Sequence, residues 1–159
     1  MPKLRNLVLY VVVGICLCLF CAQQIGSHFD APVFDRLHLP AGFPTHRGMI
    51  VIWAFLSVLT AGAGWYVFGE RIQPRRKRNV FLNLVIFVLV TFMWTWFLYV
   101  LTNFAGAIAL AVFMVILALV IWLMFLVTHR YGGYLFTPVV VWTLYCLYLS
   151  IGMLVVNRG

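Results

Sequence analysis

One uncharged run of 20 residues, 49–68, limits what this chain can fold into. At about 1.5 Å of rise per residue, a helix of that length crosses the hydrocarbon core of a bilayer, which is about 30 Å thick. Four further apolar runs have similar lengths. The predicted spans are residues 4–25, 49–68, 80–102, 105–127 and 134–156. The sequence therefore predicts an all-α integral membrane protein, a bundle of five transmembrane helices that forms a single domain over residues 1–159.

Composition agrees with this fold class and argues against nucleic acid as a partner. The chain is 65% hydrophobic and only 9% charged, whereas a soluble domain is about 25% charged. Its net charge of +8 is concentrated, because five of the eleven lysines and arginines lie within residues 71–78, between two spans. A short basic loop beside a span is typical of the cytoplasmic side, where anionic headgroups attract it. We therefore expect the lipid bilayer, and no nucleic acid, as a partner.

The distribution of charge also predicts the topology. Eight of the eleven basic residues lie on the side of the N-terminus and of a predicted loop, residues 69–79, so this side is expected in the cytoplasm and the long first loop, residues 26–48, outside. The first apolar run resembles a signal peptide but lacks a small-residue cleavage site, which favours a retained span. Its short basic start favours a bacterial cell membrane. Short turns are predicted at residues 103–104 and 128–133.

Several classes of chemistry lack the residues they need. Apart from Arg5 at the start of the first, no acidic, basic or histidine residue lies inside a predicted span, although ion-coupled transporters and membrane hydrolases usually keep one at membrane depth. Cys18 and Cys21 form a CxxC, but a thiol oxidoreductase needs a second pair and only Cys146 remains, so packing roles are favoured. His38 and His46 have no recognised ligand spacing. The sequence therefore predicts neither a catalytic residue nor a metal site.

Stripes of aromatic and hydroxyl side chains on three spans predict a binding pocket for a flat apolar ligand. Tryptophan and tyrosine combine a large ring with one polar group, which suits planar ligands. Tryptophan is also enriched at membrane interfaces as an anchor, an alternative that fits Trp65 and Trp122 by their depth. The stripes consist of Trp53 and Ser57 on the second span, Thr91, Trp94, Thr95 and Leu98 on the third, and Trp142, Tyr145, Cys146 and Leu149 on the fifth.

Prolines, tryptophans and a basic turn recur at a characteristic spacing between residues 34 and 157. The positions concerned are Pro40, Pro44, Trp53, Trp65, residues 94–99 (WTWFLY), Arg130, Gly133, Pro138 and Trp142. In order and spacing they resemble the TspO/MBR family, the translocator protein or tryptophan-rich sensory protein. That family has five spans, a long first loop rich in proline, W-S-P-L-F-F in its third span and P-Y-L-A-W at the start of its fifth.

The chain departs from the family pattern at several positions. Thr91 and Trp96 stand where the third span of the family has an asparagine and a proline. Val115 replaces the tryptophan usual in the fourth span, and Ser150 replaces an asparagine in the fifth. Because Thr91 offers a hydroxyl in place of an amide, one hydrogen bond to a ligand is expected to be lost or altered.

The resemblance implies a five-helix bundle, often a homodimer, with a pocket open toward the first loop. Such a protein binds porphyrin, haem or sterol-like molecules as a receptor or carrier with a transport, sensory or regulatory role, and needs no obligatory cofactor. Carried over position by position, the ligand-binding residues are Trp53, Thr91, Trp94, Trp142, Cys146 and, in the loop that closes the pocket, Phe34. Two alternatives remain: a small membrane enzyme that degrades or modifies a porphyrin, lipid or quinone, and a structural subunit without a ligand.

Overall fold

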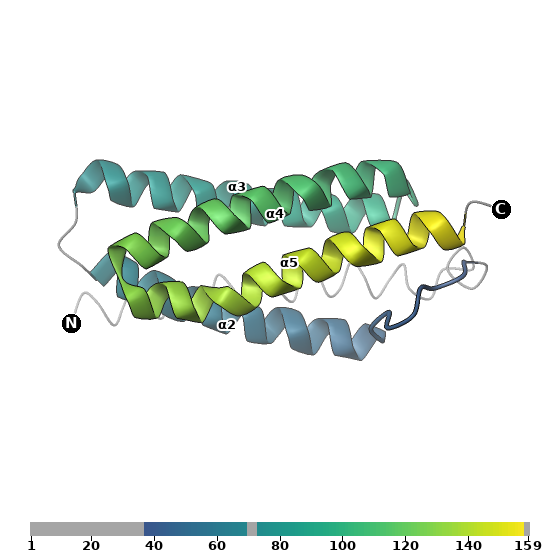
Figure 1. Cartoon of the computed structure of the whole chain (residues 1–159), viewed down its shortest axis with the longest axis horizontal. Coiled ribbons are helices and arrows are strands. Elements are labelled where there is room, and N and C mark those ends of the chain that lie inside the picture. Colours follow the sequence, from purple (N-terminus) through teal and green to yellow (C-terminus); the bar gives the residue numbers. More distant parts are fainter. Residues whose placement is uncertain (1–36, 70–72, 158–159) are drawn as a thin grey trace.

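The computed structural model describes residues 37–69 and 73–157. These residues form no strand and four long helices, which are α2 (His46–Gly69), α3 (Pro74–Tyr99), α4 (Phe104–Thr128) and α5 (Arg130–Val156) (Figure 1). Each helix is long and apolar enough to cross a membrane. The four spans predicted within this part of the chain are therefore confirmed as helices, whereas the predicted span 4–25 and Phe34 lie outside the described residues.

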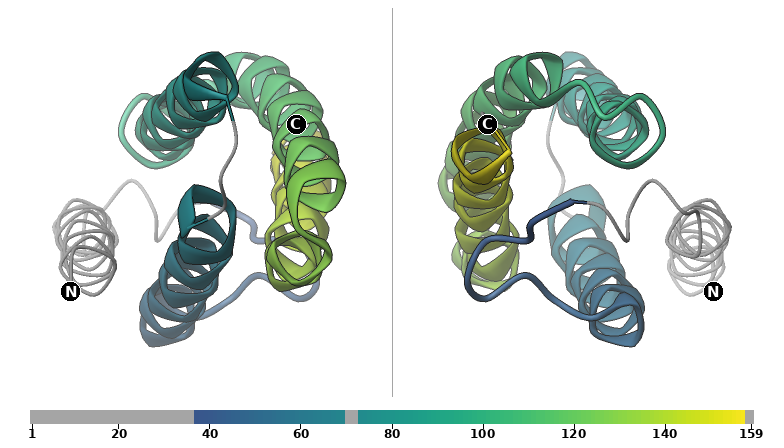
Figure 2. Two further views of the ribbon diagram at one scale, coloured as in Figure 1. Left: turned by 90° about the vertical axis from the view of Figure 1, so that its left-hand side faces the viewer. Right: turned by 90° about the vertical axis from the view of Figure 1, so that its right-hand side faces the viewer.

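The four helices do not pack in the order of the chain. Viewed end-on, α5 lies between α2 and α4, and α4 lies between α5 and α3 (Figure 2). The hairpins α3–α4 and α4–α5 connect neighbours, as short links require. Helix α2 joins the bundle mainly through α5, so residues far apart in the sequence form the interface between these two helices.

The basic segment between α2 and α3 is more helical than predicted. A loop was expected over residues 69–79, but α3 already begins at Pro74, which occupies the first helical turn. Proline suits this position because its φ is preset and its missing N–H would have no partner inside the helix. The four basic residues 75–78 consequently lie on the first turns of α3, beyond the apolar run that the prediction followed.

The end of α3 also differs from the predicted boundary at residue 102. The helix ends at Tyr99, and Thr102 adopts a φ of 48°, a left-handed conformation that cannot continue a helix. The Asn103 side chain then caps α4 by accepting a hydrogen bond from the Gly106 N–H at 3.0 Å. A Cβ on Gly106 would collide with the ring of Phe97, so this glycine allows the close approach of α3 and α4 at their turn.

The link between α4 and α5 is shorter than the predicted turn at 128–133. Only His129, with an extended backbone, separates the two helices. Gly132 and Gly133 are buried in the first turns of α5, and a Cβ on Gly133 would collide with Leu126 of α4. These glycines resemble turn residues in the sequence, but here they allow close packing between helices, a common use of small residues in membrane proteins.

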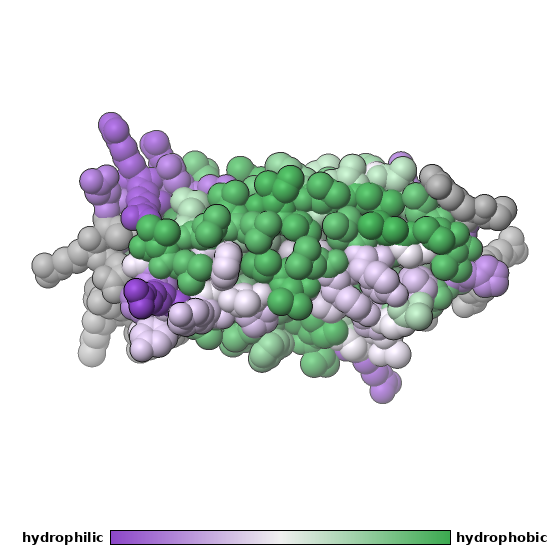
Figure 3. Space-filling model, in the orientation of Figure 1, coloured by the Kyte–Doolittle hydropathy of each residue, from purple (hydrophilic) through white to green (hydrophobic). Residues whose placement is uncertain are grey.

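Most of the core lies where α3, α4 and α5 pack together, and α2 adds Met49, Ala63 and Val67. Its largest fully buried side chains include Trp94, Phe125 and Phe136, and the last two rings pack edge to face at 5.2 Å. Large apolar side chains also cover the outer surface, and hydrophilic residues gather at the ends of the bundle (Figure 3). This distribution is expected of helices whose outer faces contact lipid.

Candidate functional site

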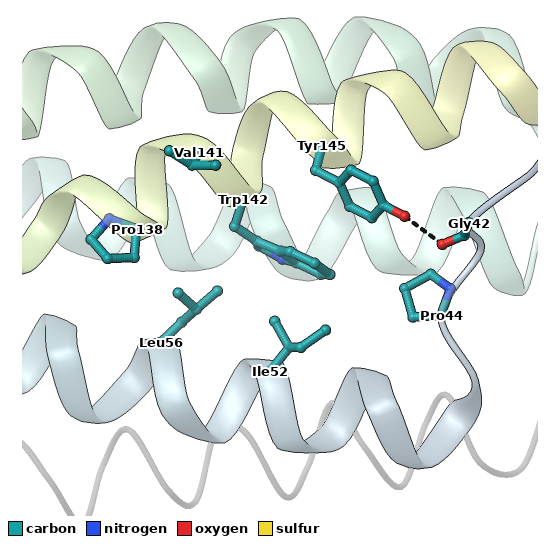
Figure 4. A pocket seen from close by; sticks show the side chains of 8 residues that line it. All are labelled: Gly42, Pro44, Ile52, Leu56, Pro138, Val141, Trp142 and Tyr145. Atoms are coloured by element: carbon teal, nitrogen blue, oxygen red, sulfur yellow. Dashed lines mark hydrogen bonds between the residues drawn. The ribbon is translucent and has the colours of Figure 1, made fainter.

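A groove of about 490 Å³ lies between α2 and α5 near the segment that precedes α2 (Figure 4). Eight described residues line it: Gly42, Pro44, Ile52, Leu56, Pro138, Val141, Trp142 and Tyr145. None of these side chains carries a charge. The groove is therefore suited to an apolar ligand, and its volume falls within the range of small-molecule sites.

Helical periodicity explains how the two helices form the groove. The α5 residues lie at i, i+3, i+4 and i+7 from Pro138, and the two α2 residues are four apart, so each set shares one helical face. Pro138 is inside α5 and has no backbone N–H to donate. Leu56 is buried at the base, whereas Val141 is 61% exposed. The groove thus extends from the helix interface to the outer surface of α5.

Two tryptophans from facing helices meet beside this groove. The rings of Trp53 on α2 and Trp142 on α5 are 6.2 Å apart at 85°, an edge-to-face contact. Both indole N–H groups are buried, and neither has a hydrogen-bond partner among the residues that the structure describes. Leaving a buried donor unsatisfied costs about 1–3 kcal/mol. The α2–α5 interface therefore holds two buried donors whose hydrogen bonds are not made within the described residues.

Trp94 lies elsewhere, in the core between α3 and α5. It is fully buried, and its indole N–H donates to the Ser150 hydroxyl at 2.8 Å. That hydroxyl donates in turn to the carbonyl oxygen of Cys146, also at 2.8 Å. This chain of hydrogen bonds satisfies the indole of Trp94, so the structure does not bring it to the groove.

Thr91 and Cys146 belong to the same core. The Thr91 hydroxyl lies 2.8 Å from the carbonyl oxygen of Phe87 and 3.2 Å from the sulfur of Met114 on α4. Cys146 is fully buried. It follows Trp142 by four residues, but it is not among the side chains that line the groove.

The structure thus brings together two of the predicted residues, Trp53 and Trp142, and places three others in the core. Tyr145 lines the groove as well, and its position three residues after Trp142 was part of the predicted stripe. The aliphatic lining residues have no chemical signature that a sequence would show. In the described part of the chain no group of three or more metal-binding side chains comes together, and the uncharged groove offers no ionic partner to a ligand.

Four apolar helices, two of which border an uncharged groove beside a pair of tryptophans, define a helical membrane protein. A family model agrees with this class: the model of the TspO/MBR family matches residues 7–156, nearly the whole chain. The chain belongs to the TspO/MBR family, which confirms the resemblance deduced from its sequence. No curated protein sequence matches it.

Proposed function

We propose that this protein is a membrane receptor or carrier that binds a tetrapyrrole or sterol-like molecule in the groove between α2 and α5. The observation that supports this most directly is the pair of buried indole N–H donors of Trp53 and Trp142, which have no partner in the described residues. Buried polar groups in native proteins are normally satisfied. An uncharged acceptor on the ligand, such as a hydroxyl or carbonyl oxygen or an imine-type ring nitrogen, would supply the missing acceptor beside the two rings.

The lining of the groove supports a flat and largely uncharged ligand. Trp142 and Tyr145 present rings 5.4 Å apart at 36°, and aliphatic side chains form the opposite wall. Such a surface favours a planar macrocycle or a fused ring system by contact area. Because no cation lines the groove, ionised ligand groups are expected to project toward the surface, where water or headgroups solvate them.

The end-to-end asymmetry of the bundle supports the proposed orientation in a bacterial cell membrane. Basic residues 75–78 and Arg130 lie at the end where α3 and α5 begin, whereas Arg47 lies at the opposite end. The positive-inside bias then assigns the first end to the cytoplasm and the segment before α2 to the outside. Exposed Ala105 and Ala109, one turn apart on α4, offer a small-residue face that would allow a homodimer.

Protoporphyrin IX is a suitable probe for the test. The full chain in lipid nanodiscs should show saturable quenching of tryptophan fluorescence, and Trp142→Ala should weaken binding by about 1–3 kcal/mol, the scale of a lost aromatic contact. Trp65→Ala is the matched control, since Trp65 is 39% exposed near the other end of α2. Quenching that does not saturate, or equal affinity in both variants, would overturn the proposal.

Recovery of the probe separates a carrier from an enzyme. After incubation in the dark and in light, a carrier should return protoporphyrin IX with its mass unchanged. A new product that depends on the protein would instead favour the alternative of a small membrane enzyme.

A further inference from the structure

The groove between α2 and α5 opens sideways at the depth of the bilayer hydrocarbon. Val141 lines the groove and is 61% exposed, so the groove reaches the outer surface of the bundle beside this side chain. Val141 lies eleven residues after the start of α5, and Leu56 lies ten residues after the start of α2 at the opposite end of the bundle. With a rise of about 1.5 Å per residue, each is about 15 Å from its end. The opening therefore faces acyl chains and not headgroups.

Water is poorly suited to fill this groove. Pro138 bounds one end of it, and Gly42 and Pro44 bound the other (Figure 4). Among the eight described lining residues, only Trp142 and Tyr145 have polar side-chain groups, and the Tyr145 hydroxyl already donates to the carbonyl oxygen of Gly42. A water molecule in a cavity needs about two to four polar partners. An apolar occupant is therefore favoured.

The surface around the opening is apolar on both helices. Val51 and Phe55 on α2 and Leu144 on α5 are all more than half exposed. The face of the molecule drawn in Figure 3 is largely hydrophobic between its hydrophilic ends. Side chains on such a face contact acyl chains when the bundle lies in a bilayer. The groove is thus a recess in a surface that lipid covers.

A recess in such a surface favours an acyl chain over empty space. If it is empty, the atoms that line it have no neighbours on one side, and their dispersion contacts are lost. An acyl chain is thin, flexible and uncharged, and it loses no hydration when it moves from the bilayer into the groove. We infer that an acyl chain of a bilayer lipid occupies the groove when no other ligand is bound, and that it enters sideways between α2 and α5 beside Val141.

An acyl chain in the groove leaves the indole N–H groups of Trp53 and Trp142 as they are, because it brings no acceptor. A ligand that carries an acceptor therefore gains an interaction that the acyl chain lacks. Binding of that ligand returns the acyl chain to the bilayer through the same opening. This displacement rests on the proposed function; the occupation of the groove by lipid does not.

Nuclear Overhauser effects between lipid and protein test the acyl-chain site without any added ligand. The full chain carries protonated methyl groups in nanodiscs of phosphatidylethanolamine and phosphatidylglycerol. Methylene protons of the acyl chains should give an effect at Leu56, which is 6% exposed at the base of the groove, and at Val58, which is 51% exposed on the same helix. Leu117 of α4 is the matched control, since it is 8% exposed and does not line the groove. Equal effects at Leu56 and Leu117, or an effect at Leu56 from water protons instead, would overturn the inference.

Two neighbouring substitutions on α2 test whether the acyl chain lies in the groove itself. Ile52 lines the groove, whereas Val51 is 67% exposed beside it. Ile52→Trp should fill the space and remove the lipid effect at Leu56 while that at Val58 stays. Val51→Trp, the matched control, adds the same bulk outside the groove and should leave both effects. A Leu56 effect of equal size in the two variants would contradict the inference, and the comparison of Leu56 with Leu117 in the unaltered chain decides it if Ile52→Trp does not fold.

Protoporphyrin IX then tests the displacement. Saturating probe should remove the lipid effect at Leu56 and leave that at Val58. A Leu56 effect that persists while the probe is bound, as judged by saturable quenching in the same nanodiscs, would overturn the displacement. If the probe does not bind at all, the proposed function fails, while the effects at Leu56 and Leu117 without probe still decide whether an acyl chain occupies the groove.

Discussion

The two sides of α5 differ in how their polar atoms are satisfied. On the side that faces α3, the indole of Trp94 donates to Ser150, which donates to a helix carbonyl. On the side that faces α2, Trp142 meets Trp53 and neither indole N–H has a partner in the described residues. The first interface is fully packed and the second borders a groove of about 490 Å³. The contrast separates a side of the helix that is packed into the core from a side that borders open space, and the proposed ligand would occupy that space.

The largest effect is expected from removing the tryptophan of the core. Trp94→Ala should lower the free energy of unfolding by about 3–5 kcal/mol, since it opens a cavity in a packed core and leaves Ser150 without its donor. Trp142→Ala should cost clearly less, because its ring borders a space that already exists. Thermal unfolding in the same detergent measures both. Equal losses would mean that the α2–α5 interface is as fully packed as the core.

An intermediate effect is expected from the hydroxyl partner of Trp94. Ser150→Ala leaves the buried indole N–H unsatisfied and should destabilise the protein by about 1–3 kcal/mol. Ser57→Ala on α2 is a control, since Ser57 is only partly buried. A neutral Ser150→Ala would show that the hydrogen bond contributes nothing to the core.

The smallest expected effect gives the sharpest test, because these substitutions should not lower the free energy of unfolding as the two above should. Trp53→Phe and Trp142→Phe remove donors that lack partners, and this gain of about 1–3 kcal/mol offsets the packing lost with the smaller ring, so unfolding free energies without ligand should change little. Both variants should nevertheless bind protoporphyrin IX more weakly. A loss of 1 kcal/mol or more without ligand would show that these donors are already satisfied, and it would remove the main support for the site.

The helices were predictable from sequence because length and absence of charge suffice to identify a span. The ends of the helices were harder to predict. Helix α3 begins at Pro74, before the apolar run, and Gly132 and Gly133 resemble a turn in the sequence although they pack inside α5. Hydropathy describes only the part of a helix that lies in lipid. Where a helix ends depends on capping and on close packing, which act outside that part.

The site was predictable only in part, for a related reason. Spacing along one helix identifies which residues share a face, and it identified Trp53 and Trp142 as candidates. It does not fix the rotation of that face relative to its neighbours, so the sequence could not show that Trp94, Thr91 and Cys146 are buried in the core and not along the groove. Their binding of a ligand stays a prediction. Aliphatic residues such as Ile52 and Leu56 are indistinguishable from ordinary lipid-facing positions until the helices are arranged in space.

The one-residue link at His129 has a mechanical consequence. Because one residue links α4 and α5 and Gly133 packs against Leu126 beside the link, we expect the two helices to move together. Widening of the gap beside Trp142 would then require movement of α2, which joins the described bundle mainly through α5. Any gating of this protein should accordingly appear as a swing of α2 against a stationary frame.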